Sequence, residues 1–225
     1  DILLNTEVHQ FQLASYAGVT ALKKGYIYWV DNSAPKDLHR IPLFSQNPLE
    51  ELVVSSFYPD GSINGSNLLF AGDWLVFMDM PSSNANSIWK LRAYNLITGE
   101  DRIILDEPGD IYSWPGPNYG VNGDWVAWVH NSWSQNLNCT ENILGITNLK
   151  THNSHELDRH CADYNSMWSV VGLSGNNLIA EQDMADNQGG NNHIWLFNLA
   201  KNSRRNISGN NDGSMPVVSG SWVVW

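Results

Sequence analysis

Charged residues are scarce in this sequence, and basic ones are the scarcest. Asp, Glu, Lys and Arg make up 16% of the 225 residues, with 12 Lys and Arg against 23 Asp and Glu. A nucleic-acid partner needs clustered cations that neutralise phosphates, and the sequence has no basic stripe, so nucleic-acid binding is not expected. The net charge of −11 also opposes binding to anionic membranes. It is compatible with sugars, cationic partners or Ca²⁺, although no motif requires a cofactor.

Long apolar runs and familiar catalytic loops are missing as well. No segment approaches the roughly 18 consecutive apolar residues of a membrane span, so no membrane insertion is expected. Residues 1–4 do not form a signal peptide, so the chain is a mature form, a domain excerpt or cytoplasmic. The absence of a Gly-rich phosphate loop and of a G-x-S-x-G elbow disfavours nucleotide-dependent and serine-hydrolase chemistry.

Only two cysteines occur, Cys139 and Cys161, and two thiols alone cannot build a Cys-rich metal site. They flank a predicted strand pair within one repeat, so a disulfide between them is geometrically plausible, with free thiols as the alternative. Between them lies a His-rich segment, residues 152–160, which also contains Asp158. Histidines with a carboxylate can bind Zn²⁺, but these lack the helical spacing that places ligands on one face, so we expect a solvated loop.

What the sequence does contain is a repeated phrase: a glycine, a polar residue or two, and then an apolar strand rich in aromatics. The phrase starts near Gly25, Gly72, Gly123, Gly175 and Gly220, at intervals of 45–52 residues. A second strand follows, as at 88–96 and 194–199, and then a short third strand, as at 102–105. Four short strands per repeat without a helical period predict an all-β fold, a β-propeller of four-stranded blades with five repeats in this chain. Residues 1–225 would form a single domain.

The two ends of the sequence look like complementary pieces of one blade. Residues 1–5, 8–13 and 19–22 resemble its second, third and fourth strands, and the sequence stops after a first strand at 222–225. We therefore expect a five-bladed ring in which this last strand completes the N-terminal blade as its innermost strand. The alternative is an excerpt of a six- to eight-bladed propeller, and the oligomeric state is left open.

The recurring pattern G-x-W-V-x-W, I-x-x-x-x-L and P-x-V-S-G resembles the TolB-like, WD40-like propeller repeats of surface and periplasmic proteins. Residues 194–199 and 215–225 carry it most fully. The fourth copy lacks its tryptophan, and five repeats are fewer than the six usual in that family. The resemblance implies an extracellular, cell-surface or periplasmic location and a role in binding proteins or as a surface module. Some similar propellers are polysaccharide lyases or hydrolases.

Aromatic residues in the expected connections between third and fourth strands, and in one loop that follows a first strand, mark a candidate ligand surface. By the alternation of strand direction, these connections share one end of the ring with the loops that follow the first strands. Aromatic rings beside Asn and Asp suit sugar binding, because rings stack on apolar sugar faces and amides bond hydroxyls. The alternative is that the rings pack between neighbouring blades and hold them together. The candidate residues are Tyr112, Trp114, Tyr119, Trp133, Tyr164 and Trp168.

Three functions stay open at this point. The first is a non-catalytic extracellular or periplasmic binding propeller whose ligand is a glycan or a protein. The second is a carbohydrate-active enzyme, a polysaccharide lyase or glycoside hydrolase, although no catalytic residue can be named. The third is a structural module of a surface array. Formation of product from a polysaccharide separates the second function from the others, and saturable binding separates the first from the third.

Overall fold

A computed structural model of the chain describes residues 20–30, 36–45, 49–57, 68–79, 88–108, 118–162, 167–183, 192–209, 216–220 and 222–225. Within these ranges the regular structure consists of eighteen β-strands and contains no helix. The expectation of an all-β fold is therefore confirmed. In the part that the structure describes, no helix could span a membrane. Internal contacts divide the chain into two compact units, residues 1–66 and 67–225, and the single domain stays a prediction.

The described part of the first unit is one antiparallel sheet of four strands in chain order. Its strands are β1 (Thr20–Lys23), β2 (Tyr26–Val30), β3 (Lys36–Pro42) and β4 (Glu51–Phe57). Lys24 and Gly25 join β1 to β2 and both have positive φ, 48° and 76°, as a tight hairpin turn requires. Trp29 is buried and stacks on His39, with 5.5 Å between ring centroids. Packing across β2 and β3 therefore helps to hold this sheet together.

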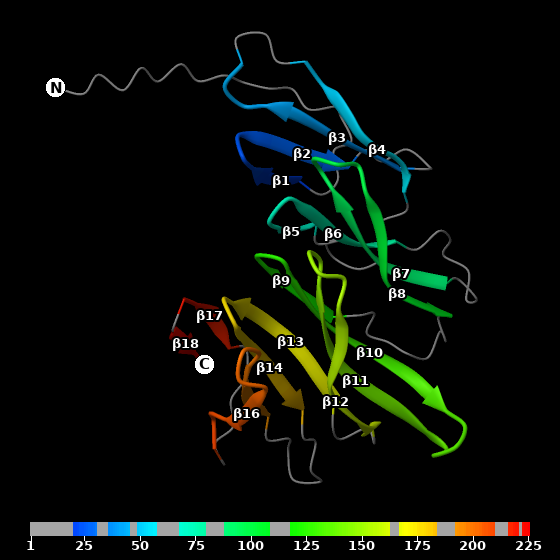
Figure 1. The fold of residues 1–225 in the computed structure, drawn as a ribbon, viewed down its shortest axis with the longest axis vertical. Coiled ribbons are helices and arrows are strands. Elements are labelled where there is room, and N and C mark those ends of the chain that lie inside the picture. The colour runs from blue at the N-terminus through cyan, green and yellow to red at the C-terminus, as the bar shows by residue number, and fades with distance from the viewer. Residues whose placement is uncertain are drawn as a thin grey trace, which may run out of the picture. The chain divides into compact units, whose positions relative to one another are not determined.

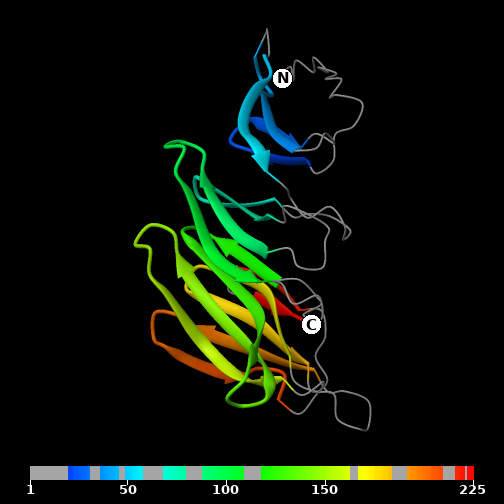
Figure 2. The same ribbon diagram turned by 90° about the vertical axis from the view of Figure 1, so that its right-hand side faces the viewer.

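The second unit contains three antiparallel sheets of four strands and a final two-stranded sheet (Figures 1 and 2). The first is β5 (Leu69–Ala71), β6 (Trp74–Asp79), β7 (Ile88–Asn95) and β8 (Asp101–Pro108). The second is β9 (Asn118–Asn122), β10 (Trp125–Ser134), β11 (Cys139–Asn148) and β12 (Ser154–Ala162). The third is β13 (Met167–Ser174), β14 (Asn177–Asp183), β15 (His193–Asn198) and β16 (Ser203–Asn206). The last pair is β17 (Val217–Ser219) and β18 (Trp222–Val224).

The recurring glycine occupies a two-residue hairpin turn in each of these sheets. Gly72, Gly123, Gly175 and Gly220 have φ between 56° and 58°. A glycine with positive φ at the first position of a two-residue loop is the mark of a type II′ hairpin, whose twist matches that of the flanking strands. The glycine therefore stands between the first and second strands of its sheet. The expectation that it opens the first strand is wrong by one strand.

The core of the second unit lies between neighbouring sheets. One buried cluster joins Val76 and Leu91 of the β5–β8 sheet to Trp128 and Ile143 of the β9–β12 sheet. A second cluster joins the β9–β12 sheet to the β13–β16 sheet, with Trp168 at its centre. Each large apolar side chain that is fully buried contributes about 1.5–3 kcal/mol. Packing of sheet on sheet, with β5, β9, β13 and β17 successively side by side, therefore holds the unit together.

The expected closure of a five-bladed ring is not confirmed. In the described ranges β18 pairs only with β17, and β1 pairs only with β2. Four sheets reach four strands and the fifth has two, so the count of five blades is not confirmed either. The segment 20–22, expected to end a blade, instead belongs to the first strand of its sheet. The predicted strands at 1–5 and 8–13 lie outside the described residues.

Candidate ligand-binding surface

The longest hairpin in the described part of the chain belongs to the β9–β12 sheet. Its strands β10 and β11 have 10 residues each, whereas β6 has 6 and β14 has 7. The pairing runs without a break from Trp125 opposite Asn148 to Ser134 opposite Cys139. Only the first half of β10 also pairs with β9, so the rest of the hairpin, in green in Figure 1, extends past β9.

Side chains alternate between the two faces of this hairpin. Ala127 and Val129 pack into the core against the β13–β16 sheet, so Asn131 and Trp133 point to the same face farther along the strand. Trp133 lies opposite Thr140 of β11 and is 56% exposed. Beyond the core, this face therefore presents an indole ring flanked by an amide and a hydroxyl.

The opposite face of the hairpin is braced. Cys139 and Cys161 form a disulfide between the start of β11 and the end of β12, with 5.7 Å between their Cα atoms. Arg159 of β12 bridges Glu141, with Nη1 to Oε2 at 2.8 Å, and Glu156. The predicted disulfide is confirmed. The disulfide and the Arg159–Glu141 ion pair both run across strands, so they tie this end of β11 to β12.

A buried asparagine anchors the same end to the neighbouring sheet. Asn142 is 1% exposed. Its Nδ2 donates to Asn131 Oδ1 at 2.8 Å, and its Oδ1 accepts from the backbone N–H of Trp168 at 2.8 Å. A buried amide with such partners is costly to displace. Asn142 therefore fixes the position of Asn131 beside Trp133.

Asp158 of β12 is the centre of a second link between the sheets. Its carboxylate accepts from Trp168 Nε1 at 2.9 Å, His160 Nδ1 at 3.1 Å and Arg204 Nη1 at 2.5 Å. Burial acts to raise the pKa of Asp158, but the bonds from Trp168, Arg204 and His160 outweigh it and hold the pKa below its usual value. The charged carboxylate of Asp158 therefore links β12 to β13 and to β16.

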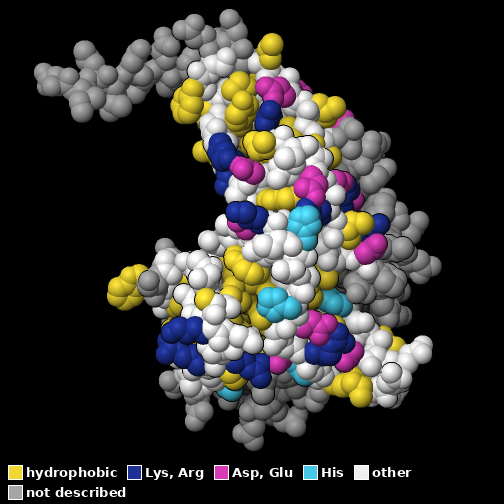
Figure 3. All heavy atoms as spheres, viewed as in Figure 1, with side chains coloured by type: hydrophobic (Ala, Val, Ile, Leu, Met, Phe, Trp, Pro, Cys, Tyr) yellow, Lys and Arg dark blue, Asp and Glu magenta, His cyan; other side chains and the backbone are white. Residues whose placement is uncertain are grey.

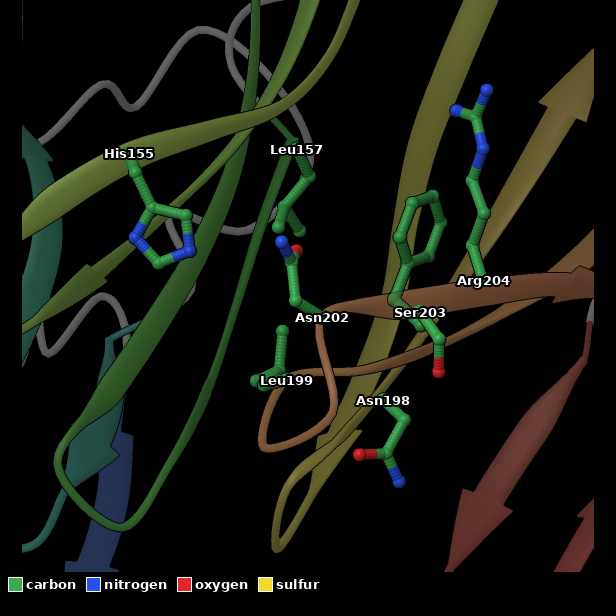
Figure 4. A pocket seen from close by; sticks show the side chains of 8 residues that line it. His155, Leu157, Asn198, Leu199, Asn202, Ser203 and Arg204 are labelled. Atoms are coloured by element: carbon green, nitrogen blue, oxygen red, sulfur yellow. The ribbon is translucent and has the colours of Figure 1, made fainter.

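A pocket of about 200 Å³ lies between the β9–β12 sheet and the β13–β16 sheet. Figure 4 shows His155 and Leu157 reaching into it from β12, and Leu199 and Asn202 from the turn between β15 and β16. Arg204, which also lines the pocket, pairs with Asp158. The pocket is therefore small, and both apolar and polar side chains line it.

Two of the six predicted ligand residues turn out to be packed between sheets. Trp168 is 3% exposed and lies edge-on to Trp195 and Phe197, at 6.1 and 5.6 Å between ring centroids. Burial raises the pKa of Tyr119 far above its usual value, against a weaker opposing effect of a hydrogen bond with the backbone of Met78. Only Trp133 is well exposed among the described candidates. The remaining three, Tyr112, Trp114 and Tyr164, lie outside the described residues, and a ligand role for any of the six stays a prediction.

The His-rich segment is a strand and not the loop that the sequence suggested. Residues 154–162 form β12, where His155 lines the pocket and His160 bonds Asp158. Within the described ranges no group of three or more His, Cys, Asp or Glu side chains could hold a metal ion.

Asp79, at the end of β6, is 8% exposed and forms an ion pair with Arg92. Its role on the evidence of these contacts is structural.

Comparison with known proteins relates the chain to propeller domains of larger enzymes. A solved prolyl endopeptidase matches with a TM-score of 0.57 and 11% identity, over 89% of this chain and 30% of its own. The chain has a propeller-like β-fold. An acylaminoacyl peptidase from Pyrococcus horikoshii matches over 85% of this chain and 32% of its own, with a TM-score of 0.48 and 11% identity. An oligogalacturonate lyase in complex with manganese matches over 90% and 67%, with a TM-score of 0.34 and 15% identity.

The resemblance to the TolB-like repeat family is wrong. No family model matches this chain, and no curated protein matches it. The structural likeness is instead to a prolyl endopeptidase, and the described strands do not close a ring. The short pattern of glycine, tryptophan and valine recurs because tight hairpins and buried strands demand those residue types. This chain spans about a third of the length of the two peptidases.

The polar groups that position the site could not be identified from the sequence. Asn142 and Trp168 are 26 residues apart, and Asp158 and Arg204 are 46 apart. No local motif marks such pairs, because they meet only when two sheets pack. The one available signal was a polar residue directly before an apolar run, as at Asn142 in β11.

Proposed function

We propose that this chain is a non-catalytic binding module that works outside the cytoplasm and holds a glycan at the end of the β10–β11 hairpin. The observation that carries the proposal is the exposed ring of Trp133 on a hairpin whose opposite face is braced. The Trp133 ring is 56% exposed and lies beyond the core, on a strand whose partner β11 is joined to β12 by a disulfide. It has no packing role in the described structure.

The neighbours of Trp133 match the chemistry of a sugar. The faces of a pyranose ring are apolar and stack on an indole, while its hydroxyls need donors and acceptors around the rim. Asn131 and Thr140 supply an amide and a hydroxyl on the same face as the ring. The net charge of −11 favours a neutral glycan over a polyanionic one.

A disulfide supports the location. Disulfides form and persist in the periplasm, at cell surfaces and in secreted proteins, and are rare in reducing compartments. Cys139 and Cys161 are joined, and no described cysteine is free. This agrees with a module that meets its ligand in an oxidising environment.

Fluorescence titration with a panel of neutral and anionic polysaccharides tests the proposal. We expect a saturable shift in tryptophan emission with one class of neutral glycan, and at least a tenfold loss of affinity, about 1.4 kcal/mol, in Trp133→Ala. Asn131→Ala should show a smaller loss, because it removes hydrogen bonds but leaves the stacking ring in place.

Trp222→Ala is the matched control, since Trp222 is also exposed, at 78%, but belongs to β18. It should bind like the unaltered protein. Equal binding by Trp133→Ala, or binding of no glycan in the panel, would refute the glycan surface and leave a protein ligand as the next hypothesis. Release of cleaved sugar from a bound polysaccharide would refute the non-catalytic role.

A further inference from the structure

Two described segments match the acceptor motif for N-linked sugars, which is asparagine, any residue except proline, and then serine or threonine. The first is Asn138-Cys139-Thr140, where the β10–β11 hairpin turns, and the second is Asn206-Ile207-Ser208, at the end of β16. A third match, residues 64–66, lies outside the described residues. Such a motif arises easily by chance in a sequence rich in asparagine, so the structural setting of each copy has to separate them.

Asn206 and Ser208 are already used by the fold. The Asn206 Nδ2 donates to the carbonyl of Gly209 at 3.1 Å, and its Oδ1 accepts from the Gly209 backbone N–H at 2.9 Å. Ser208 is 4% exposed, donates to Asn206 Oδ1 at 3.2 Å and accepts from the backbone N–H of Ile194 at 3.1 Å. These bonds close the turn after β16 and tie it to β15, so they account for both residues without a modification.

Asn138 has a different setting. It is exposed, as are the three residues before it, in the turn that joins β10 to β11. Its φ of 53° lies in the left-handed region, which glycine and asparagine both adopt. Glycine would therefore serve the backbone here as well as asparagine does, so the turn itself does not require the side-chain amide.

The rest of the first motif is accessible and lies in a suitable compartment. Thr140, which supplies the hydroxyl of the motif, is half-buried in β11, opposite Trp133. Cys139, between Asn138 and Thr140, forms the disulfide with Cys161. A disulfide is typical of the oxidising compartments through which secreted proteins pass, and surface turns of secreted proteins are where N-linked sugars are attached.

We propose that Asn138 is an N-glycosylation site whose donor is an oligosaccharide carried on a lipid pyrophosphate. The Asn138 Nδ2 forms a bond to C1 of the first sugar while the bond from C1 to the phosphate oxygen breaks. The lipid pyrophosphate leaves with the bonding electrons, and a proton of Nδ2 passes to a base of the transferase. The site rests on the proposed location outside the cytoplasm and not on the proposed binding of a glycan at Trp133.

The disulfide does not block this transfer. Cys161 follows Cys139 by 22 residues, and a secreted chain is made and translocated from its N-terminal end. Asn138 therefore reaches the transferase before Cys139 has its partner, while the segment is still extended. Once the hairpin has formed, the exposed turn leaves room for the sugar chain.

The full chain, secreted from eukaryotic cells behind a cleavable signal peptide, tests the site. We expect the secreted protein to be heavier than its polypeptide by the mass of an attached oligosaccharide. Treatment with peptide N-glycosidase hydrolyses the modified amide, so peptide mass spectrometry should then find aspartate at position 138 in most molecules. Asn206 should remain largely asparagine, because its amide and the hydroxyl of Ser208 are tied into the fold.

Matched variants separate the motif from the turn. Asn138→Gly keeps a residue suited to the left-handed φ but removes the acceptor amide, so it should lose this sugar. Thr140→Ser keeps the motif and should keep the sugar. Thr140→Val keeps the size and branching of the side chain but lacks the hydroxyl, so it should lose the sugar. Urea unfolding of each variant, produced without sugar in bacteria, should match that of the unaltered protein and show that the losses are not caused by misfolding.

An unmodified Asn138 in the secreted protein would overturn the proposal. More sugar at Asn206 than at Asn138, or a sugar retained by Thr140→Val, would overturn it as well. These results are distinct from a failure of the glycan surface, since the titrations of Trp133→Ala and the unaltered protein use protein made without N-linked sugar.

Discussion

Asp158 shows how a single side chain serves the site from a distance. It touches no exposed part of the glycan surface, yet it receives hydrogen bonds from Trp168, His160 and Arg204. The backbone of Trp168 in turn holds Asn142, which holds Asn131. The exposed face around Trp133 is therefore fixed by a chain of polar contacts between two sheets.

Replacing Asp158 with Asn should change how stability depends on pH. The pKa of Asp158 in the folded protein lies below its usual value, which is about 3.9 for an unfolded chain. The carboxylate therefore stabilises the fold above that pH, and this contribution disappears as the pH falls through the folded pKa. Urea unfolding at pH 7, 5, 4 and 3 should show a stability gap between wild type and Asp158→Asn that narrows below about pH 4. A gap that stays constant, or widens in acid, would contradict this role.

Position 145 requires glycine because the Trp128 ring leaves no room for a side chain there, and not because of the backbone φ angle of Gly145. Its Cβ would lie 2.2–2.6 Å from three atoms of Trp128, whose Nε1 is fixed by a bond to Thr147 Oγ1 at 2.9 Å. Overpacking of this kind costs about 1–3 kcal/mol or more. Gly145→Ala should lose at least that in urea unfolding, whereas Ser134→Ala, farther along the same hairpin, should change stability by less than about 0.5 kcal/mol. A tolerated Gly145→Ala would mean that Trp128 is free to move.

At the scale of elements, the β10–β11 hairpin owes its rigidity to the disulfide with β12. The bond closes a segment of 22 residues, for which the loss of unfolded-state entropy corresponds to about 3 kcal/mol. The double variant Cys139→Ser, Cys161→Ser should lose about 2–4 kcal/mol in urea unfolding and should also bind glycan more weakly. A variant of unchanged stability and affinity would show that the hairpin needs no brace.

The elements themselves were predictable from the sequence, but their grouping into sheets was not. Each glycine marks a tight hairpin, and the interval between glycines gives four strands per repeat. The same pattern is satisfied whether the sheet begins before or after the glycine, and the prediction took the wrong choice. Only the pairing of Ala71 with Trp74, across Gly72, decides it.

The candidate site was predictable to a similar degree. Trp133 could be selected because it stands in a polar stretch, at a place where no core residue is expected. Trp168 looked equivalent in sequence but is buried by Phe197 and Trp195. The residues around an aromatic side chain in the sequence do not show whether it packs between two sheets or is free to bind a ligand. The difference depends on which sheet lies opposite to it in the fold.

At the scale of the whole molecule, the two compact units make a prediction about independence. All the residues of the glycan surface belong to residues 67–225. A fragment of these residues should therefore fold cooperatively and bind the same glycan within a factor of about three of the whole chain. Loss of cooperative unfolding, or of binding, in this fragment would show that residues 1–66 are part of the site.

Charge also acts at this scale. On the face shown in Figure 3 the cationic and acidic side chains are interspersed, and no basic stripe crosses it. With a net charge of −11, binding of a neutral glycan should be nearly independent of salt, since no ion pairs are formed. A steep loss of affinity between low and high salt would instead point to a charged ligand.

The indole N–H resonances of ¹⁵N-labelled protein, followed during titration with the glycan that binds, test the central claim most directly. Each of the 11 tryptophans gives one signal, which single substitutions to Phe assign. We predict that the Trp133 signal shifts with saturation while those of the buried Trp128 and Trp168 and of the remote Trp222 stay in place. A shift centred on any of these three, with Trp133 unmoved, would contradict the account.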